Sequence, residues 1–146
     1  MKLIFRGSRD GWKTTDYHRL CDDKGPIVVI VKVHNGRICG GYASNWKGPS
    51  SGVWEKDPKA FLFSLDLETN YHQPTQGEAK NVCFHINNGP YFGWGGSLGL
   101  CSTMNLSNYG YCCINSKSLS VGGDSEGRSE LTGCKDRFTC SELEVF

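Results

Sequence analysis

Short apolar runs, separated by glycines and polar residues, occupy most of the chain. This pattern is typical of β-structure. The runs lie at residues 3–5, 26–42, 59–67, 81–86, 89–100 and 137–146. They predict about eight short strands, with long polar loops at 44–59 and 116–135. We therefore expect a mainly β (α+β) fold: a two-sheet antiparallel β-sandwich with one or two short flanking helices.

One segment has helical spacing. Tyr17, Leu20 and Cys21 lie at i, i+3 and i+4, which places them on one face of a helix. Thr14 or Thr15 can cap its start, and the Gly-Pro pair at 25–26 ends it. The sequence predicts a short helix that is held in place by packing.

The segment 26–42, "PIVVIVKVHNGRICGGY", is the strongest structural signal. Its centre, Asn35-Gly36, is the preferred pair of a two-residue type I′ hairpin turn. With that turn, His34 faces Arg37, Val33 faces Ile38 and Val31 faces Gly40. Residues 27–31 are apolar on both faces, which predicts a central strand covered above and below. The adjacent glycines at 40–41 indicate a bulge or the close approach of another backbone.

The last run, "RFTCSELEVF", changes its pattern near Ser141. Phe138 and Cys140 have even numbers, whereas Leu143 and Val145 have odd numbers. In a regular strand the two pairs would therefore lie on opposite faces. A β-bulge near Ser141 would place all four side chains on the same face.

Composition narrows the class of protein. The chain has 146 residues and a formal net charge of +1, which is the size of one domain. A nearly neutral chain lacks the basic excess of a general nucleic-acid surface, so we expect no nucleic-acid partner. Apolar runs are far shorter than the ~20 residues of a membrane span. Leu3 to Phe5 is also too short for the apolar core of a secretion signal, and we interpret it as a strand.

The eight cysteines raise the question of redox state. An even number permits a disulfide framework in an exported protein. Since no export signal is visible, we expect reduced thiols in the cytoplasm, several of them buried in strands as small apolar residues. An extracellular, disulfide-bonded domain is the alternative.

Six segments in a fixed order identify a family resemblance. They are "LIFRGSRDGW", "LCDDKGP", "GRICGGYAS" followed by Trp46, "KAFLFSL", "GPYFG" and the terminal "SELEVF". Together they strongly resemble the TLDc domain of the oxidation-resistance proteins, over essentially the whole chain. The resemblance implies a two-sheet β-sandwich with flanking helices, and a single domain at 1–146 that lacks the family's N-terminal segment. One departure is Ser97-Leu98, where family members often have Asp-Leu.

The resemblance also implies a role. TLDc proteins are associated with resistance to oxidative stress, and several bind the vacuolar-type proton ATPase. It therefore implies a non-catalytic protein-interaction domain in the cytoplasm. The expected partner is that ATPase, through which the domain would be recruited to organelle membranes.

The segment "RGSRDG" offers the first candidate residues: Ser8, Arg9 and Asp10. Ser8 or Asp10 can bond to nearby backbone N–H groups, which is good turn chemistry. The same segment can also form a partner-binding loop with charges of both signs. Both readings stay open from the sequence.

Glu142 and Glu144 lie on one face of the terminal strand. Like charges at this spacing cost stability when they are buried, so they need an explanation. They form a solvated edge face, salt bridges to basic residues near the first loop, or an acidic surface for a partner. As a catalytic carboxylate pair they lack a visible third group.

Trp46 and Trp94 are candidate interface anchors, because exposed tryptophans are frequent hot spots of binding. Each can instead pack against the sandwich. The glycine-rich segment around Trp94 lacks the Lys-Ser/Thr ending of a phosphate-binding loop.

Evidence for catalysis or metal binding is weaker. His18 and Cys21 are close on the helix, but a thiol nucleophile also needs a lowered pKa and an oxyanion donor. Cysteine spacings lack the close pairs of structural zinc sites. We expect no catalytic residues, no metal and no cofactor. The alternative is a thiol-dependent or hydrolytic enzyme of unknown substrate.

Overall fold

The computed structural model describes residues 1–48, 51–72, 80–93, 98–105, 110–111, 131–134 and 137–146. These segments contain two helices and twelve strands. The elements are β1 (Phe5–Arg6), α1 (Gly7–Asp10), α2 (Thr14–Cys21), β2 (Gly25–Val33), β3 (Ile38–Trp46), β4 (Ser51–Glu55), β5 (Phe61–Ser64), β6 (Thr69–His72), β7 (Val82–His85), β8 (Asn88–Phe92), β9 (Leu98–Cys101), β10 (Gly110–Tyr111), β11 (Arg137–Phe138) and β12 (Cys140–Val145).

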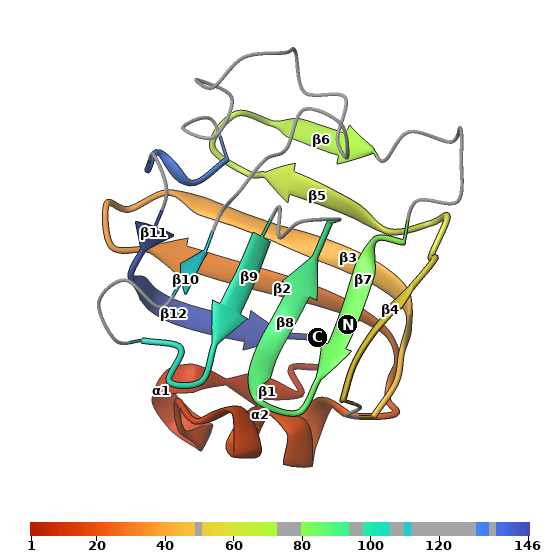
Figure 1. The fold of residues 1–146 in the computed structure, drawn as a ribbon. Helices are drawn as coiled ribbons and strands as arrows, with labels where there is room; N and C mark the ends of the chain where they lie inside the picture. The colour runs from red at the N-terminus through yellow and green to blue at the C-terminus, as the bar shows by residue number, and fades with distance from the viewer. Residues whose placement is uncertain (49–50, 73–79, 94–97, 106–109, 112–130, 135–136) are drawn as a thin grey trace.

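The strands form two antiparallel six-stranded sheets (Figure 1). The first sheet has the order β1-β12-β2-β3-β5-β6, and the second has the order β11-β10-β9-β8-β7-β4. Both helices lie at one end of the sandwich, next to β1. The predicted mainly β sandwich with short flanking helices is confirmed. In the described segments, no helix combines the length and the apolar character needed to cross a membrane.

Apolar side chains from both sheets meet in one core. The inward face of β2 contributes Val29 and Val31, and the second sheet contributes Phe84 and Phe92. Trp46 lies between the layers, with ring-centroid distances of 5.1 Å to Phe84 and 5.8 Å to Phe92. Aromatic rings therefore fill the space between the two sheets at this point.

The predicted helix forms as α2, but both of its ends differ from the prediction. It ends at Cys21 with Asp22 as the C-cap, and the Gly-Pro pair at 25–26, which was expected to end it, instead begins β2. The N-cap position is Lys13, and no side chain caps the helix, so the expected Thr14 or Thr15 cap is wrong. Thr14 is instead buried, and its N–H donates to Ser102 O at 3.1 Å. Pairing with another segment fixes this helix start, in place of a side-chain cap.

The β2–β3 hairpin forms, but its predicted register is wrong by one residue. Val31 faces Cys39, whereas a two-residue turn would have placed it opposite Gly40. Gly36 has a φ of +94°, and Asn35 has no positive φ. A type I′ turn needs positive φ at both central residues. A single such glycine fits the longer three-residue loop, which shifts every pair by one position.

Strand β2 is central in its sheet, but its two faces differ. Ile27, Val29 and Val31 are buried, whereas Val28 and Ile30 are only half-buried. The prediction that both faces are fully covered is therefore wrong. The outer face of this sheet retains partly exposed apolar side chains.

The Gly40-Gly41 pair marks a close approach. A Cβ atom on Gly40 would lie 2.0 Å from Val29 O and 2.6 Å from the Phe63 ring. No bulge occurs at these glycines; the irregularity in this strand pair lies between Gly25 and Ile27. Phe63 packs over the glycine on the outer face, so the close approach is the correct alternative.

The polar loop predicted at 44–59 contains more structure than expected. Strand β3 continues to Trp46, and β4 occupies residues 51–55. The run 59–67 is shorter than predicted: β5 ends at Ser64, and Leu65 and Leu67 are exposed. The second predicted loop, 116–135, lies largely outside the described residues.

Strand β12 contains the predicted bulge. The register between β12 and β2 shifts between Cys140 and Glu142. Phe138, Cys140, Leu143 and Val145 are all buried in consequence. The strand lies between β1 and β2, so the expectation of a solvated sheet edge at Glu142 and Glu144 is wrong.

Candidate functional site

The first loop and the last strand come together at one end of the sandwich. Strand β1 pairs with β12, with Phe5 opposite Val145 and Arg6 opposite Glu144. Helix α1 continues directly from β1 and contacts β12. We call the surface formed by residues 6–10 with Glu142 and Glu144 the loop–strand surface.

Glu142 is bound by Ser8. The Ser8 hydroxyl donates to Glu142 Oε2 at 2.5 Å, and the Ser8 N–H donates to Glu142 Oε1 at 3.1 Å. The Leu143 N–H adds a third bond to the same carboxylate, at 3.1 Å. Desolvation alone would raise the pKa of Glu142, but these bonds and the nearby charge of Arg6 outweigh it and lower the pKa. Glu142 is therefore held as a carboxylate.

Glu144 is bound by Arg6. Arg6 Nε donates to Glu144 Oε1 at 2.7 Å, and Arg6 Nη2 forms an ion pair with the same oxygen. The guanidinium side chain remains 45% exposed, and the glutamate side chain is 22% exposed. Of the alternatives for the two glutamates, the salt bridge to the first loop is correct for Glu144. Sequence analysis did not single out Arg6, although it lies in the quoted "RGSRDG" segment.

Arg9 and Asp10 form a bidentate pair. Arg9 Nε and Nη2 donate to the two Asp10 oxygens at 2.8 and 2.7 Å. The Arg6 N–H also donates to Asp10, at 2.8 Å, which closes the short helix α1. The hydrogen bonds from Arg9, and the smaller effect of the Arg6 N–H, lower the pKa of Asp10. Asp10 therefore both stabilises the turn and contributes a negative charge to the loop–strand surface.

The tryptophan candidates have different outcomes. Trp46 is 2% exposed and packs between Tyr17, Phe84 and Phe92. A side chain this buried cannot anchor a partner without leaving the core, so the structure removes Trp46 from the candidates. Trp94 lies outside the described residues.

A comparison with models of protein families matches the TLDc domain over residues 1–146. The chain belongs to the TLDc domain family. A search among curated proteins found no match to this chain.

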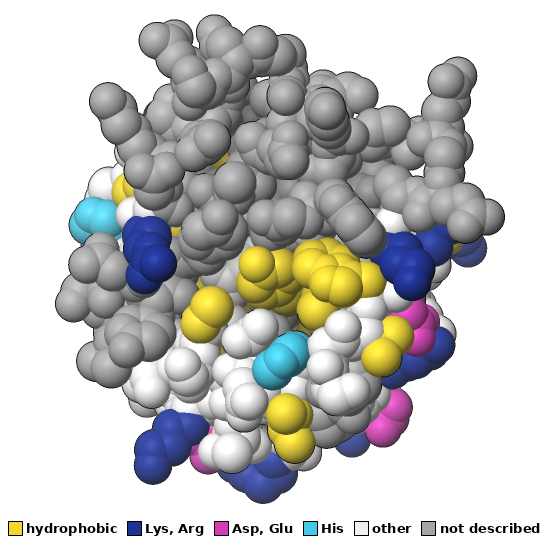
Figure 2. Space-filling view, in the orientation of Figure 1, with side chains coloured by type: hydrophobic (Ala, Val, Ile, Leu, Met, Phe, Trp, Pro, Cys, Tyr) yellow, Lys and Arg dark blue, Asp and Glu magenta, His cyan; other side chains and the backbone are white. Residues whose placement is uncertain are grey.

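Charged side chains of this TLDc domain lie around the margin of the space-filling view, including its lower part over α1 and α2 (Figure 2). Hydrophobic side chains are visible nearer the middle of the same view.

Five of the six described thiols of the TLDc domain are not activated. Desolvation raises the pKa of Cys21, Cys83, Cys101, Cys134 and Cys140, that of Cys140 to about 12. A raised pKa keeps a thiol protonated at neutral pH, whereas a nucleophile needs the thiolate. The pair Cys112-Cys113 lies outside the described residues.

His18 does not act on Cys21. Its Nδ1 bonds to Asp22 Oδ1 at 2.9 Å, and its Nε2 bonds to Asn88 O at 3.0 Å. Both ring nitrogens are thereby engaged, and the contact with Asn88 ties α2 to β8 of the second sheet. Among the described residues, no three His, Cys, Asp or Glu side chains converge in a group that could hold a metal ion.

Asp57 is a buried acid that sequence analysis missed. It is 7% exposed and accepts bonds from Ser44 N at 2.6 Å, Ser44 Oγ at 2.7 Å and Lys59 N at 3.0 Å. Its own N–H donates to Asn81 Oδ1 at 2.7 Å. These bonds join the end of β3 to the segment before β7, which is a structural role. The Asp-Pro pair at 57–58 is a turn signal that fits the bond from Lys59 N, but no local pattern marks the bonds to Ser44 and Asn81, which come from distant segments.

Proposed function

We propose that this TLDc domain is a non-catalytic protein-interaction domain that uses the loop–strand surface to recognise its partner. The supporting observation is the set of charges that residues 6–10 and the two glutamates hold in fixed positions. Arg6 and Arg9 remain 45% and 51% exposed while their positions are set by Glu144 and Asp10. Side chains fixed before binding lose less entropy on association.

A surface of both signs suits specific protein recognition. Complementary charges accelerate encounter and disfavour wrong partners, more than they add raw affinity. Ser8 and Asp10 supply oxygen acceptors, whereas Arg6 and Arg9 supply planar donors that suit carboxylates. A partner would therefore match this surface with acidic side chains facing the two arginines.

The partner that we propose is the vacuolar-type proton ATPase, with a role in resistance to oxidative stress. We place the protein in the cytoplasm, recruited to organelle membranes through that ATPase. Family membership supports this proposal, because several TLDc proteins bind this ATPase and the family is associated with resistance to oxidative stress. The raised pKa values of the five thiols support a non-catalytic role over a thiol-dependent enzyme.

The test is a pull-down from lysate that contains vacuolar membranes, followed by titration of the purified ATPase. The wild-type domain should recover ATPase subunits. Arg9→Glu reverses an exposed charge next to Asp10 and should weaken binding roughly 10-fold, with the loss largest at low salt. Lys80→Glu makes the same charge change at an exposed position outside the loop–strand surface and serves as the matched control.

The two outcomes test the identity of the partner and the location of the binding site separately. If no ATPase subunit is recovered under several nucleotide conditions, the ATPase is not the partner. If binding is as strong for Arg9→Glu as for Lys80→Glu, the loop–strand surface is not the binding site.

A further inference from the structure

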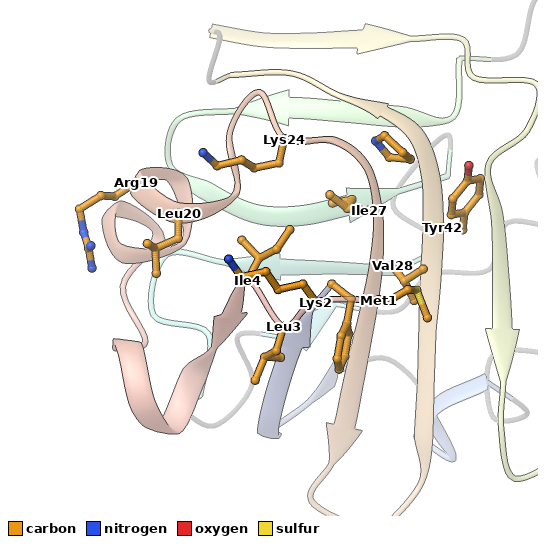
Figure 3. Close-up of a pocket in the computed structure, with 12 residues that line it drawn as sticks. Met1, Lys2, Leu3, Ile4, Arg19, Leu20, Lys24, Ile27, Val28 and Tyr42 are labelled. Carbon is orange, nitrogen blue, oxygen red and sulfur yellow. The ribbon is translucent and has the colours of Figure 1, made fainter.

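A second feature lies on the outer face of the first sheet, next to the loop–strand surface, because Ile4 and Phe146 are two residues from Arg6 and Glu144. It is a groove of about 780 Å³ between the sheet, helix α2 and the N-terminal residues 1–4 (Figure 3). Its size is within the ~300–1,000 Å³ of typical ligand sites. It opens where the outer side chains of β2 are only half-buried.

The floor and walls of the groove are apolar. Val28 and Tyr42 line it from the neighbouring strands β2 and β3, where they face each other in register. Leu20 from α2 and Ile4 from the N-terminal segment line the other side (Figure 3). Phe146 also lines the groove, and its backbone is fixed to Val28 by two hydrogen bonds, at 2.9 and 3.0 Å.

The charged side chains that line the groove are all basic: Lys2, Arg19 and Lys24. All three are exposed. In the part of the chain that the structure describes, none of them forms an ion pair. The side chains of the rim therefore present positive charge to any ligand in the groove.

The nearest acids are engaged elsewhere. Asp10, whose charge is felt by Arg19, accepts both donors of Arg9. Asp22 bonds to His18, and Asp23 accepts the Gly48 N–H at 2.9 Å. The hydrogen bonds and ion pairs given for these three carboxylates are therefore to groups other than Lys2, Arg19 and Lys24.

We propose that this groove binds an acidic amphipathic helix of a protein partner. An apolar stripe of such a helix would lie over Val28, Leu20 and Tyr42, and flanking Asp or Glu side chains would meet Lys2, Arg19 and Lys24. A helix laid in an apolar groove by its i, i+3, i+4 and i+7 residues is a recurring mode of recognition. It also adds a helical layer to an uncovered sheet face, which is how such faces are usually buried.

The shape of the groove favours a helix over a single fatty-acid chain. Leu20, Val28 and Tyr42 remain half-buried, so an apolar chain in the groove would stay partly in water. An amphipathic helix needs only one side covered and keeps its polar side solvated. The inference does not depend on the ATPase, because the groove is lined by residues other than 6–10, 142 and 144 and its partner is defined by chemistry alone.

The test starts from a displayed library of 16-residue segments. Apolar residues are fixed at i, i+3, i+4 and i+7, and the other positions are random. Binders selected on the wild-type domain should be enriched in Asp and Glu next to the apolar stripe. In methyl-labelled protein, their addition should shift the signals of Leu20 and Val28 and leave that of Ile86, exposed in the turn between β7 and β8, unchanged.

Charge reversal then tests the rim. The double variant Lys2→Glu, Lys24→Glu should bind the selected peptides roughly 5- to 30-fold more weakly, as expected for two exposed pairs that become repulsive. The matched control Lys59→Glu, Lys80→Glu has the same net charge and should bind within about twofold of the wild type. Both variants change only exposed lysines, so folding is preserved.

Four outcomes would overturn the proposal. They are a selection without binders, binders without acidic enrichment, equal affinity for the two double variants, and methyl shifts confined to Ile86. Vesicles with 30% phosphatidylserine form a separate arm. If they shift Leu20 and Val28 while the peptides do not, the occupant is a membrane surface and the protein-helix proposal is wrong.

Discussion

Replacing Ser8 with alanine tests whether the first loop and the last strand stabilise each other. The change removes the 2.5 Å bond from the Ser8 hydroxyl to Glu142, but it keeps the bond from the Ser8 N–H. A hydrogen bond to a charged group contributes about 1.5–3 kcal/mol. Because Ser8 is exposed, water replaces part of the lost bond, and we expect a loss of about 1 kcal/mol in the free energy of unfolding at pH 7.

The effect should depend on pH with a defined sign. The pKa of Glu142 is lower in the folded than in the unfolded protein. The bonds to its carboxylate therefore stabilise the fold above the unfolded pKa of about 4.3, and this contribution is lost as pH falls through the folded pKa. The difference between wild type and Ser8→Ala should be largest at pH 7 and should shrink below about pH 4.

Urea unfolding at pH 7, 5 and 4 measures this difference, and NMR titration of the Glu142 carboxyl carbon measures its pKa. Ser8→Ala should raise the pKa of Glu142. Ser141→Ala is the control, since its hydroxyl bonds only to neutral backbone oxygens, Lys32 O at 3.0 Å and Val33 O at 3.3 Å. An unchanged Glu142 pKa, or an equal pH dependence for both variants, would refute the reasoning.

Three further predictions concern the core. Trp46→Ala should lower the free energy of unfolding by about 3–5 kcal/mol, whereas Leu65→Ala, at a position 53% exposed, should change it by less than about 0.5 kcal/mol in the same urea titration. Gly40→Ala places its Cβ 2.6 Å from Phe63, and closer still to a backbone oxygen, so we expect loss of the folded state by circular dichroism. Cys140, with its pKa raised to about 12, should resist iodoacetamide at pH 7.5 in the native protein and react after denaturation, as read by mass spectrometry; fast native alkylation would contradict its burial.

The features that the sequence predicted correctly are those set by local pattern. The parity change around Ser141 predicted the β12 bulge, because four apolar residues must share one buried face. The spacing of Tyr17 and Cys21 predicted α2, and both side chains are fully buried. Each of these inferences needed only the period of the secondary structure and the location of the core.

The features that it missed depend on a single dihedral angle or on distant residues. The hairpin register depends on whether Asn35 adopts a positive φ. The Asn-Gly pair is compatible with both the two-residue type I′ turn and the three-residue loop, so the sequence does not decide between them. Trp46 ends a strand, and nothing local decides whether such a ring points inward. The bond between Ser8 and Glu142 joins residues 134 positions apart. Only the topology of the sheet, with β12 between β1 and β2, brings the two together.

The position of β12 has a consequence for biosynthesis. It lies between the first strand of the chain and β2, so β1 has no strand neighbour, and β2 has only β3, until residues 140–145 have left the ribosome. The first sheet can therefore be completed only after translation of these residues, and until then a chaperone would find one edge of β2 unpaired. A premature stop codon a few residues upstream would remove the strand that joins β1 to β2 and abolish folding.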